Sequence, residues 1–233
     1  SFPTRRSSDL SVQGYIQILD EKSQRLRQLT ADLVEASKIS SGNVKLDMQV
    51  IDLVELVYQT SGEFNEKFEQ KELTIVTKLP KTAVLIRADG RQLYRVIENL
   101  YNNVAKYALE KTRVYVDIAY VEEKVVFSIK NVSEHSLARE NSNAGDLTER
   151  FIRGDSSRTT EGSGLGLSIA KSLTVLMGGV FDIKVDGDLF KASITFPQYV
   201  DENSSNPKME EPASEDDYEI EELEPDRKST RLN

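Results

Sequence analysis

Hydrophobic residues in the first part of the chain recur at the spacing of one helical face. Residues 14–37 contain no proline. Four large apolar residues among them fall on a single stripe: Ile16, Leu19, Leu26 and Leu33. Such a stripe has to be covered, so we expect an antiparallel partner helix or a second copy of the same helix against it. Gly42 and Asn43 are expected to end the helix.

The middle of the chain alternates between the period of strands and the period of helices. Apolar residues at every second position predict a strand at 44–50, and residues 73–79 and 83–87 are expected to form two more strands, joined at Pro80 and Lys81. Asp52 can cap a helix that runs to about residue 70, and Asp89 with Gln92 forms a capping-box pattern before a helix over residues 90–109. Runs rich in β-branched and aromatic residues predict two hairpins, 113–120 with 124–131 and 178–186 with 189–196. A last helix is expected over residues 165–177.

A polar stretch, residues 132–162, separates the two predicted hairpins and is rich in Ser, Asn and Arg. A segment of this length without apolar periodicity is unusual inside a compact domain and indicates a lid or a ligand loop. The strands and helices alternate without a regular βαβ rhythm. We therefore predict the α/β (α+β) class, as a two-layer sandwich of a mixed sheet and helices.

Composition changes this picture mainly at the C-terminal end. Of the net charge of −9, residues 201–225 carry −10 and residues 226–233 carry +2, which leaves −1 on residues 1–200. A nearly neutral body argues against a nucleic-acid-binding protein. Residues 201–225 have few large apolar side chains, so we predict a disordered acidic tail. The absence of cysteine excludes disulfides, and apolar runs of at most four residues exclude a membrane span.

Asparagines gather beside the apolar face of the helix predicted over residues 90–109. That face comprises Leu93, Val96, Ile97, Leu100 and Val104, and outside it lie Asn99, Asn102, Asn103 and Lys106. Asn99 and Asn103 are four residues apart and share one side of the helix. Asparagine is a poor helix former, so these residues indicate a role other than helix stability. Amide oxygens suit a magnesium ion that keeps water and phosphate ligands, whereas a solvated helix face is the alternative.

Three glycines alternate with other residues directly before the last predicted helix, in the sequence GSGLGL of residues 162–167. Glycine lets the backbone approach an anion closely, and a helix N-terminus offers N–H groups to it. The spacing is neither that of a dinucleotide fingerprint nor that of a P-loop. The segment predicts a phosphate site, with a flexible linker as the alternative.

Taken together, three motifs resemble the ATP-binding catalytic domain of sensor histidine kinases, in the group of gyrase, heat-shock, kinase and mismatch-repair (GHKL-type) ATPases. They are ENLYNNVAKY (98–107), ERFIRGD (149–155) and EGSGLGLSIAKSL (161–173). The resemblance covers residues 44–200, and residues 11–43 look like the second helix of the family's dimerisation and phosphotransfer hairpin. Residues 1–10 and 226–233 resemble translated sequencing adapters, so we expect them outside the fold.

The resemblance implies ATP and Mg²⁺ as cofactors and assigns roles to single residues. Asn103 would hold magnesium against the phosphates with Asn99 in support, and Lys106 and Tyr107 would contact the nucleotide. The other implied contacts come from the lid, from the second glycine box and from the end of a strand: Phe151, Arg153, Gly162, Gly164, Leu165, Gly166, Leu167 and Asn131. The family has an aspartate for adenine where this chain has Asn131, whose amide oxygen is a weaker acceptor.

The implied activity is that of a protein-histidine kinase, which transfers the γ-phosphoryl group of ATP to a histidine and onward to a response regulator. The single histidine, His135, lies beside the predicted lid, and the His-Glu/Asp pair of the first hairpin helix is missing. We therefore expect ATP binding without self-phosphorylation by this chain. An ATPase or serine-directed kinase of the same superfamily, and a non-catalytic module of the same fold, stay open as alternatives.

The resemblance also implies partners. They are a second copy of the chain, through the dimerisation helices, and the receiver domain of a response regulator. No nucleic acid is expected, and a membrane only through segments upstream of this sequence. The expected location is the cytoplasm, in a parent protein anchored to the membrane.

Overall fold

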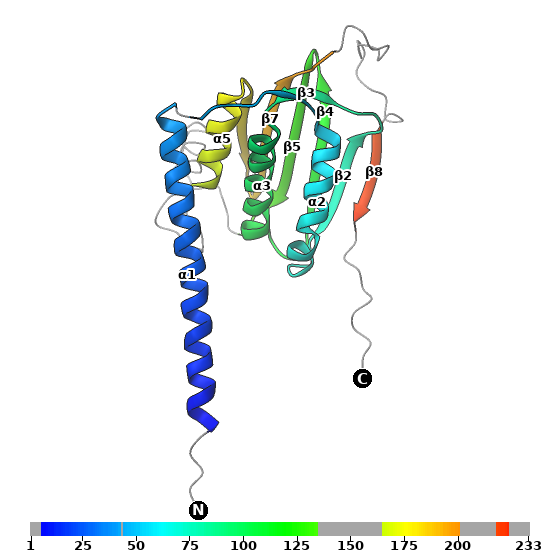
Figure 1. Cartoon of the computed structure of the whole chain (residues 1–233). Coiled ribbons are helices and arrows are strands. Elements are labelled where there is room, and N and C mark those ends of the chain that lie inside the picture. The colour runs from blue at the N-terminus through cyan, green and yellow to red at the C-terminus, as the bar shows by residue number, and fades with distance from the viewer. Residues whose placement is uncertain (1–5, 43, 135–164, 201–217, 224–233) are drawn as a thin grey trace, which may run out of the picture.

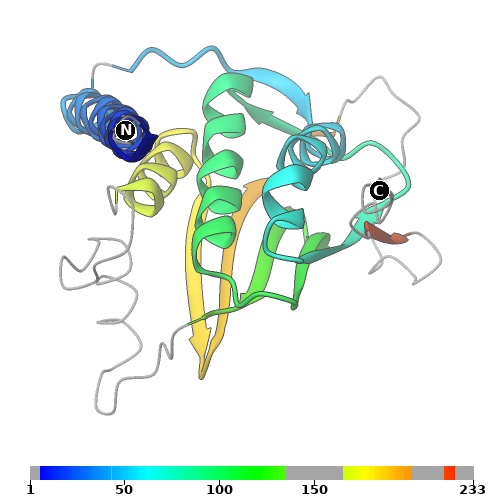
Figure 2. The ribbon, with the colours of Figure 1, turned by 90° about the horizontal axis from the view of Figure 1, so that it is seen from below.

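The computed structural model describes residues 6–42, 44–134, 165–200 and 218–223, and these form an α+β sandwich with one long helix at its side (Figure 1). Helices α2 (Leu53–Glu69), α3 (Gly90–Tyr107) and α5 (Gly166–Leu176) cover one face of a six-stranded sheet (Figure 2). Helix α1 (Arg6–Ser40) extends away from the sandwich and meets it beside α5. The predicted fold class is confirmed.

The sheet is mixed, with the strand order β6-β7-β5-β4-β2-β8. Its strands are β2 (Thr74–Pro80), β4 (Arg113–Val121), β5 (Lys124–Val132), β6 (Val180–Asp186), β7 (Leu189–Pro197) and β8 (Tyr218–Leu223). Only β2 and β4 pair in parallel, and the other neighbours are antiparallel. Both predicted hairpins are present as β4–β5 and β6–β7. A separate two-stranded sheet joins β1 (Gln49–Asp52) to β3 (Leu85–Ala88).

Three predicted boundaries are wrong. Helix α1 begins at Arg6, inside the segment that we expected to lie outside the fold. Residues 44–48 are not part of a strand: Leu46 and Met48 pack partly buried against the core, but only residues 49–52 pair with β3. Alternating apolar and polar residues indicate that one side of an extended segment is buried. They do not show that the segment has a hydrogen-bonded neighbouring strand.

The third correction concerns the acidic tail. Residues 218–223 form strand β8, which pairs with β2 in antiparallel register from Ile75 opposite Leu223 to Pro80 opposite Tyr218. The average composition of residues 201–225 predicted disorder. This average conceals a short segment in which the apolar residues Tyr218, Ile220 and Leu223 lie between the acidic residues. A strand on an existing sheet edge needs much less apolar surface than an independent domain. The rest of the tail lies outside the described residues.

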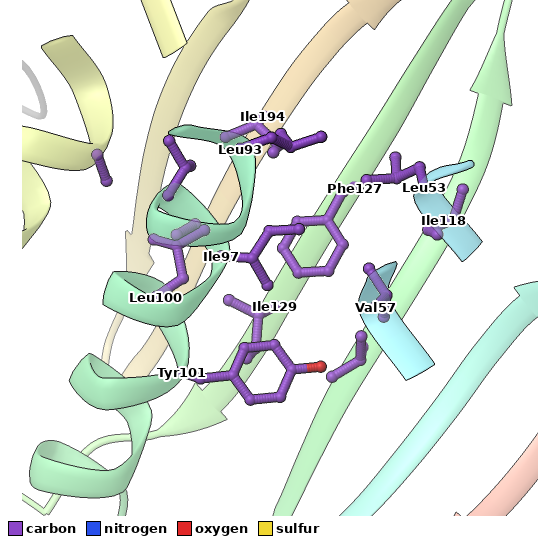
Figure 3. Close-up of a cluster of buried hydrophobic side chains, with 14 of the residues drawn as sticks. Leu53, Val57, Leu93, Ile97, Leu100, Tyr101, Ile118, Phe127, Ile129 and Ile194 are labelled. Atoms are coloured by element: carbon purple, nitrogen blue, oxygen red, sulfur yellow. The ribbon is translucent and has the colours of Figure 1, made fainter. Parts of the chain in front are cut away.

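The core lies between α3 and the central strands. Every residue that we assigned to the apolar face of α3 is buried, and Tyr101 joins them with no exposed surface. Figure 3 shows Ile97 and Tyr101 of α3 directed at Phe127 and Ile129 of β5, and Leu93 directed at Ile194 of β7. The Tyr101 hydroxyl lies 2.7 Å from the Ser61 hydroxyl of α2, which links the two helices inside the core.

The apolar stripe of α1 is open in the single chain. Ile16, Leu19, Leu26 and Leu33 keep 59 to 64% of their surface exposed, and only the last turns, with Ala36 and Ile39, pack against the core. Gly42 ends the helix with a φ of 68° and donates its N–H to the carbonyl of Ile39, as expected from a C-terminal glycine. Among the described residues, none of the helices has the length and apolar character required to cross a bilayer.

Candidate nucleotide site

The asparagines of α3 make contacts with different partners. Asn99 and Asn103 lie half-exposed outside the buried face, and the Asn99 amide donates to the carbonyl of Arg95 at 2.9 Å. Asn102 instead accepts a bond from Nζ of Lys67 on α2 at 3.3 Å. The structure therefore explains Asn102 by helix packing and leaves Asn99 and Asn103 as the pair with a shared, solvent-accessible side.

Helices α3 and α5 pack side by side (Figure 1), and the first residue of α5, Gly166, lies directly against Asn99. A Cβ added to Gly166 would lie 2.9 Å from Oδ1 of Asn99 and 3.7 Å from its Cγ. Since real Cβ atoms do not approach a neighbour this closely, position 166 requires glycine as long as Asn99 keeps its place. The predicted convergence of the asparagine helix and the glycine segment is present for these two residues.

The first turn of α5 offers backbone N–H groups beside Asn99. The N-cap residue Leu165 makes no side-chain cap, and the first turn contains no acidic residue. The N–H of Ile169 donates to the carbonyl of the N-cap residue Leu165, so the N–H groups of residues 166–168 precede the helical ladder. Together with the helix dipole, they favour an anion at this end.

The C-terminal end of α3 is joined to the end of β5. The N–H of Leu109 donates to Val132, and the N–H of Glu134 donates to the carbonyl of Tyr107, both at 2.9 Å. These bonds bring the exposed Lys106 and the half-buried Tyr107 to the strand end that carries Asn131.

Asn131 is a polar residue on the apolar side of the sheet. It lies opposite Val114 of β4 and Phe190 of β7, which are both buried, and it keeps only 3% of its own surface exposed. Opposite residues in antiparallel strands share a face, so Asn131 faces the helix layer. Its amide nitrogen donates to the carbonyl of Val132 at 2.9 Å, which directs the amide at the strand end. The structure thus places the amide of Asn131 in a buried position at the end of β5.

Sequence analysis missed a lysine that holds the end of α3. Nζ of Lys71 donates to the carbonyl of Lys106 at 2.9 Å and to that of Ala108 at 3.4 Å. A positive charge at a helix C-terminus satisfies carbonyls that have no partner in the helix. Lys71 lies between α2 and β2, and no local motif connects it with α3 in the sequence.

Asp89 fixes the other end of α3. Its carboxylate accepts from the N–H of Gln92 at 3.0 Å, as the capping pattern predicted, and also from the N–H of Asp47 at 2.9 Å. Burial raises the pKa of the Asp89 carboxyl. The N–H groups of Asp47, Gln92 and Arg91, together with the charge of Arg91, lower this pKa by more than burial raises it, so the net shift is downward. The helix that carries the asparagines is thus held at both ends by charged side chains.

Several predicted site residues lie outside the described residues, and their placement stays a prediction. They are Phe151 and Arg153 of the expected lid and Gly162 and Gly164 of the glycine segment, together with His135. The predicted residues that the structure describes are Asn99, Asn103, Lys106, Tyr107, Asn131, Leu165, Gly166 and Leu167.

A family model described as "Histidine kinase-, DNA gyrase B-, and HSP90-like ATPase" matches residues 88–208, which is just over half of the chain. The chain belongs to this ATPase family. The match begins directly before α3 and includes both the asparagine and the glycine segments. The sequence-based identification of the ATP-binding catalytic domain of a sensor histidine kinase is confirmed.

Relatives of this histidine kinase-like ATPase are sensor proteins. The alginate biosynthesis sensor protein KinB of Pseudomonas aeruginosa is 29% identical over 179 residues, which are 76% of this chain and 28% of KinB. The sensor protein VanSC of Enterococcus gallinarum is 29% identical over 71% of this chain and 45% of its own length. The sensor histidine kinase WalK of Bacillus subtilis is 24% identical over 78% of this chain and 30% of its own length. The chain spans less than half of each of these relatives.

Solved structures share the fold of this ATPase domain. Full-length ShkA in complex with AMPPNP has a TM-score of 0.66 at 21% identity, over 80% of this chain and 38% of ShkA. The catalytic domain of histidine kinase ThkA has a TM-score of 0.56 at 19% identity, over 66% of this chain and 97% of the ThkA domain. At these identities the similarity establishes the architecture alone.

Proposed function

We propose that this chain binds Mg²⁺–ATP between α3 and the N-terminal end of α5, as the catalytic part of a sensor histidine kinase. The observation that carries the proposal is the close approach of Gly166 to Asn99, with 2.9 Å between a built Cβ and the amide oxygen. Amide oxygens that suit a magnesium ion and N–H groups that suit phosphate are thereby adjacent. An ATP triphosphate with its magnesium ion has the chemistry that matches both.

The asparagines, Lys106 and the start of α5 have separate roles in this proposal. Asn103, supported by Asn99, would hold magnesium, which neutralises charge on the phosphates when it is bound. The N–H groups at the start of α5 and the ammonium group of Lys106 would bind phosphate oxygens. Asn131 would accept a hydrogen bond from the adenine amino group through its amide oxygen. The protein's part is to position the γ-phosphoryl group and to exclude water from it.

The proposed reaction is phosphoryl transfer to a histidine outside this chain. The bond between the γ-phosphorus and the bridging oxygen of ATP breaks, a bond from phosphorus to an imidazole nitrogen forms, and ADP leaves. The sensor names of the relatives support this acceptor and a response regulator as the next partner. We further propose that the open stripe of α1 pairs with a second copy, and that the domain works in the cytoplasm of a membrane-anchored parent.

Titration with a non-hydrolysable ATP analogue tests the proposal, because neighbouring asparagines provide a matched control. The variant Asn103→Ala lacks the proposed magnesium ligand. We expect its affinity for the analogue to fall at least tenfold in the presence of magnesium and to change little in the absence of magnesium. Asn102→Ala removes an amide that contacts Lys67 instead, so its affinity should stay within about twofold of the wild type. Equal affinity of the wild type and Asn103→Ala, or an equal loss in both variants, would contradict the proposal.

A second experiment separates the kinase from the two alternatives. The chain is incubated with γ-labelled ATP and with the dimerisation hairpin of a relative, and the label is followed. Acid-labile label on the hairpin alone supports a histidine kinase without self-phosphorylation. Release of phosphate without protein label would favour an ATPase, acid-stable label would favour a serine-directed kinase, and no nucleotide binding would favour a non-catalytic module.

A further inference from the structure

The edge of the sheet far from the nucleotide site is closed by the chain's own acidic segment. Figure 1 shows β8 alongside β2, on the side of the sandwich opposite to α1. The pairing covers six consecutive positions, from Ile75 to Pro80, and so occupies nearly the whole length of β2. The segment belongs to no part of the asparagine and glycine site.

Without β8, strand β2 would be the edge of the sheet. Its other side is paired with β4, so its second row of N–H and C=O groups would face solvent. The strand has the sequence TIVTKLP, in which Lys78 is the only charged residue. A flat, mostly apolar edge of this kind is a template for any extended peptide.

A buried hydroxyl on β2 also points to an occupant of this edge. Thr77 has no exposed surface, and its Oγ1 donates to the carbonyl of Glu221 in β8 at 3.4 Å. Its neighbours at alternate positions, Ile75 and Leu79, belong to the apolar core. The strand on this edge therefore contributes a backbone carbonyl to the Thr77 side chain, in addition to the backbone ladder.

Charge favours an acidic strand at this position. Strand β8 contains Glu219, Glu221 and Glu222 and no basic residue, and in the register of the pair Glu222 is diagonal to Lys78, the charged residue of β2. Opposite or diagonal charges on paired strands stabilise the pair. The glutamates also make β8 a poor template for a further strand on its outer edge, since charged edge strands resist pairing.

We propose that the β2 edge is an acceptor site for an extended acidic peptide strand, and that Tyr218–Leu223 of the same chain is its built-in, exchangeable occupant. The occupant is held on one side only, and its attachment to the chain gives it a high effective concentration. A free strand of the same chemistry has to compete with it. The β2 edge is thus a peptide-binding surface whose availability is controlled by the tail.

Cysteine pairing tests the occupant in the full chain, which contains no cysteine of its own. Lys78 lies directly opposite Ile220, whereas Leu223 lies opposite Ile75. The variant Lys78→Cys/Ile220→Cys should form an intramolecular disulfide under mild oxidation at least tenfold faster than Lys78→Cys/Leu223→Cys. Equal rates would overturn the proposal. A disulfide-linked dimer as the main product would also overturn it, because the occupant would then be a second copy.

A labelled peptide of residues 215–225 tests the exchange. Adjacent strand residues direct their N–H groups to opposite edges, so the double change Ile220→Pro/Glu221→Pro removes at least one donor to β2 and opens the edge. This full-chain variant should bind the peptide at least tenfold more tightly than the wild type does, and less tightly at high salt. A peptide with the same two prolines should not bind. Equal binding by the two chains, or binding of the proline peptide, would refute the acceptor site.

Discussion

The substitution Gly166→Ala tests the contact between α5 and α3. The new Cβ would lie 2.9 Å from Oδ1 of Asn99, whereas ordinary van der Waals contacts begin at 3.4 Å, so the amide has to move or rotate. Rotation breaks its 2.9 Å bond to the carbonyl of Arg95, which costs about 0.5–1.5 kcal/mol. Alanine in place of glycine returns up to about 1 kcal/mol in helix propensity.

These opposing contributions predict different outcomes for folding and for binding. The free energy of unfolding should stay within about 1 kcal/mol of the wild type, because the two contributions are similar in size. The affinity for an ATP analogue should fall about five- to thirtyfold, which corresponds to about 1–2 kcal/mol for a displaced support of the magnesium ligand. Urea denaturation measures the first quantity, and calorimetric titration in magnesium measures the second.

Gly62→Ala is the matched control, because nothing lies within 4 Å of a Cβ at this exposed position of α2. It should raise stability by about 0.5–1 kcal/mol and leave nucleotide affinity unchanged. A stable Gly166→Ala protein with wild-type affinity would refute the reasoning, and so would an equal loss of affinity in Gly62→Ala.

Three further predictions concern the supports of α3. Asp89→Ala should cost about 1–2 kcal/mol at neutral pH in urea denaturation, because the N–H groups of Gln92 and Asp47 lose their acceptor. The pKa of Asp89 is lower in the folded chain, so this contribution is complete above the unfolded value of about 3.9 and is lost as the pH falls through the folded value. A cost that grew as the pH was lowered below about 3.9 would contradict it. Tyr101→Phe should lower stability by about 1–2 kcal/mol in thermal unfolding, since it leaves the buried Ser61 hydroxyl without this partner, and a neutral change would count against the bond. Lys71→Met should weaken binding of the ATP analogue a few-fold through the released end of α3, and unchanged affinity would exclude this positioning role.

Local features of the sequence predicted the parts of the fold that local physics determines. The apolar spacing of Leu93 to Val104 defined the buried face of α3, and Asp52 and Asp89 marked the starts of two helices. Both hairpins followed from β-branched runs with short turns between them. Each of these signals extends over fewer than twenty residues.

Long-range pairings were not predictable in the same way. Neither the parallel pairing of β2 with β4 nor the addition of β8 has a signal in the spacing of residues, because the partners are distant in sequence. Only the structure distinguishes Asn102, which bonds to Lys67 of α2, from Asn99 and Asn103, because all three belong to one asparagine-rich turn. The motifs identified the chemistry of the site, but only the packing of α5 on α3 joins Gly166 to Asn99.

The central claim is that the asparagine helix and the start of α5 bind one and the same nucleotide. Solution NMR of the isotope-labelled chain, titrated with a magnesium-bound ATP analogue, tests it most directly. The side-chain amide signals of Asn99 and Asn103 and the backbone amide signals of Gly166 and Leu167 should shift together with one dissociation constant. Shifts in only one of the two groups, or two different dissociation constants, would contradict the account.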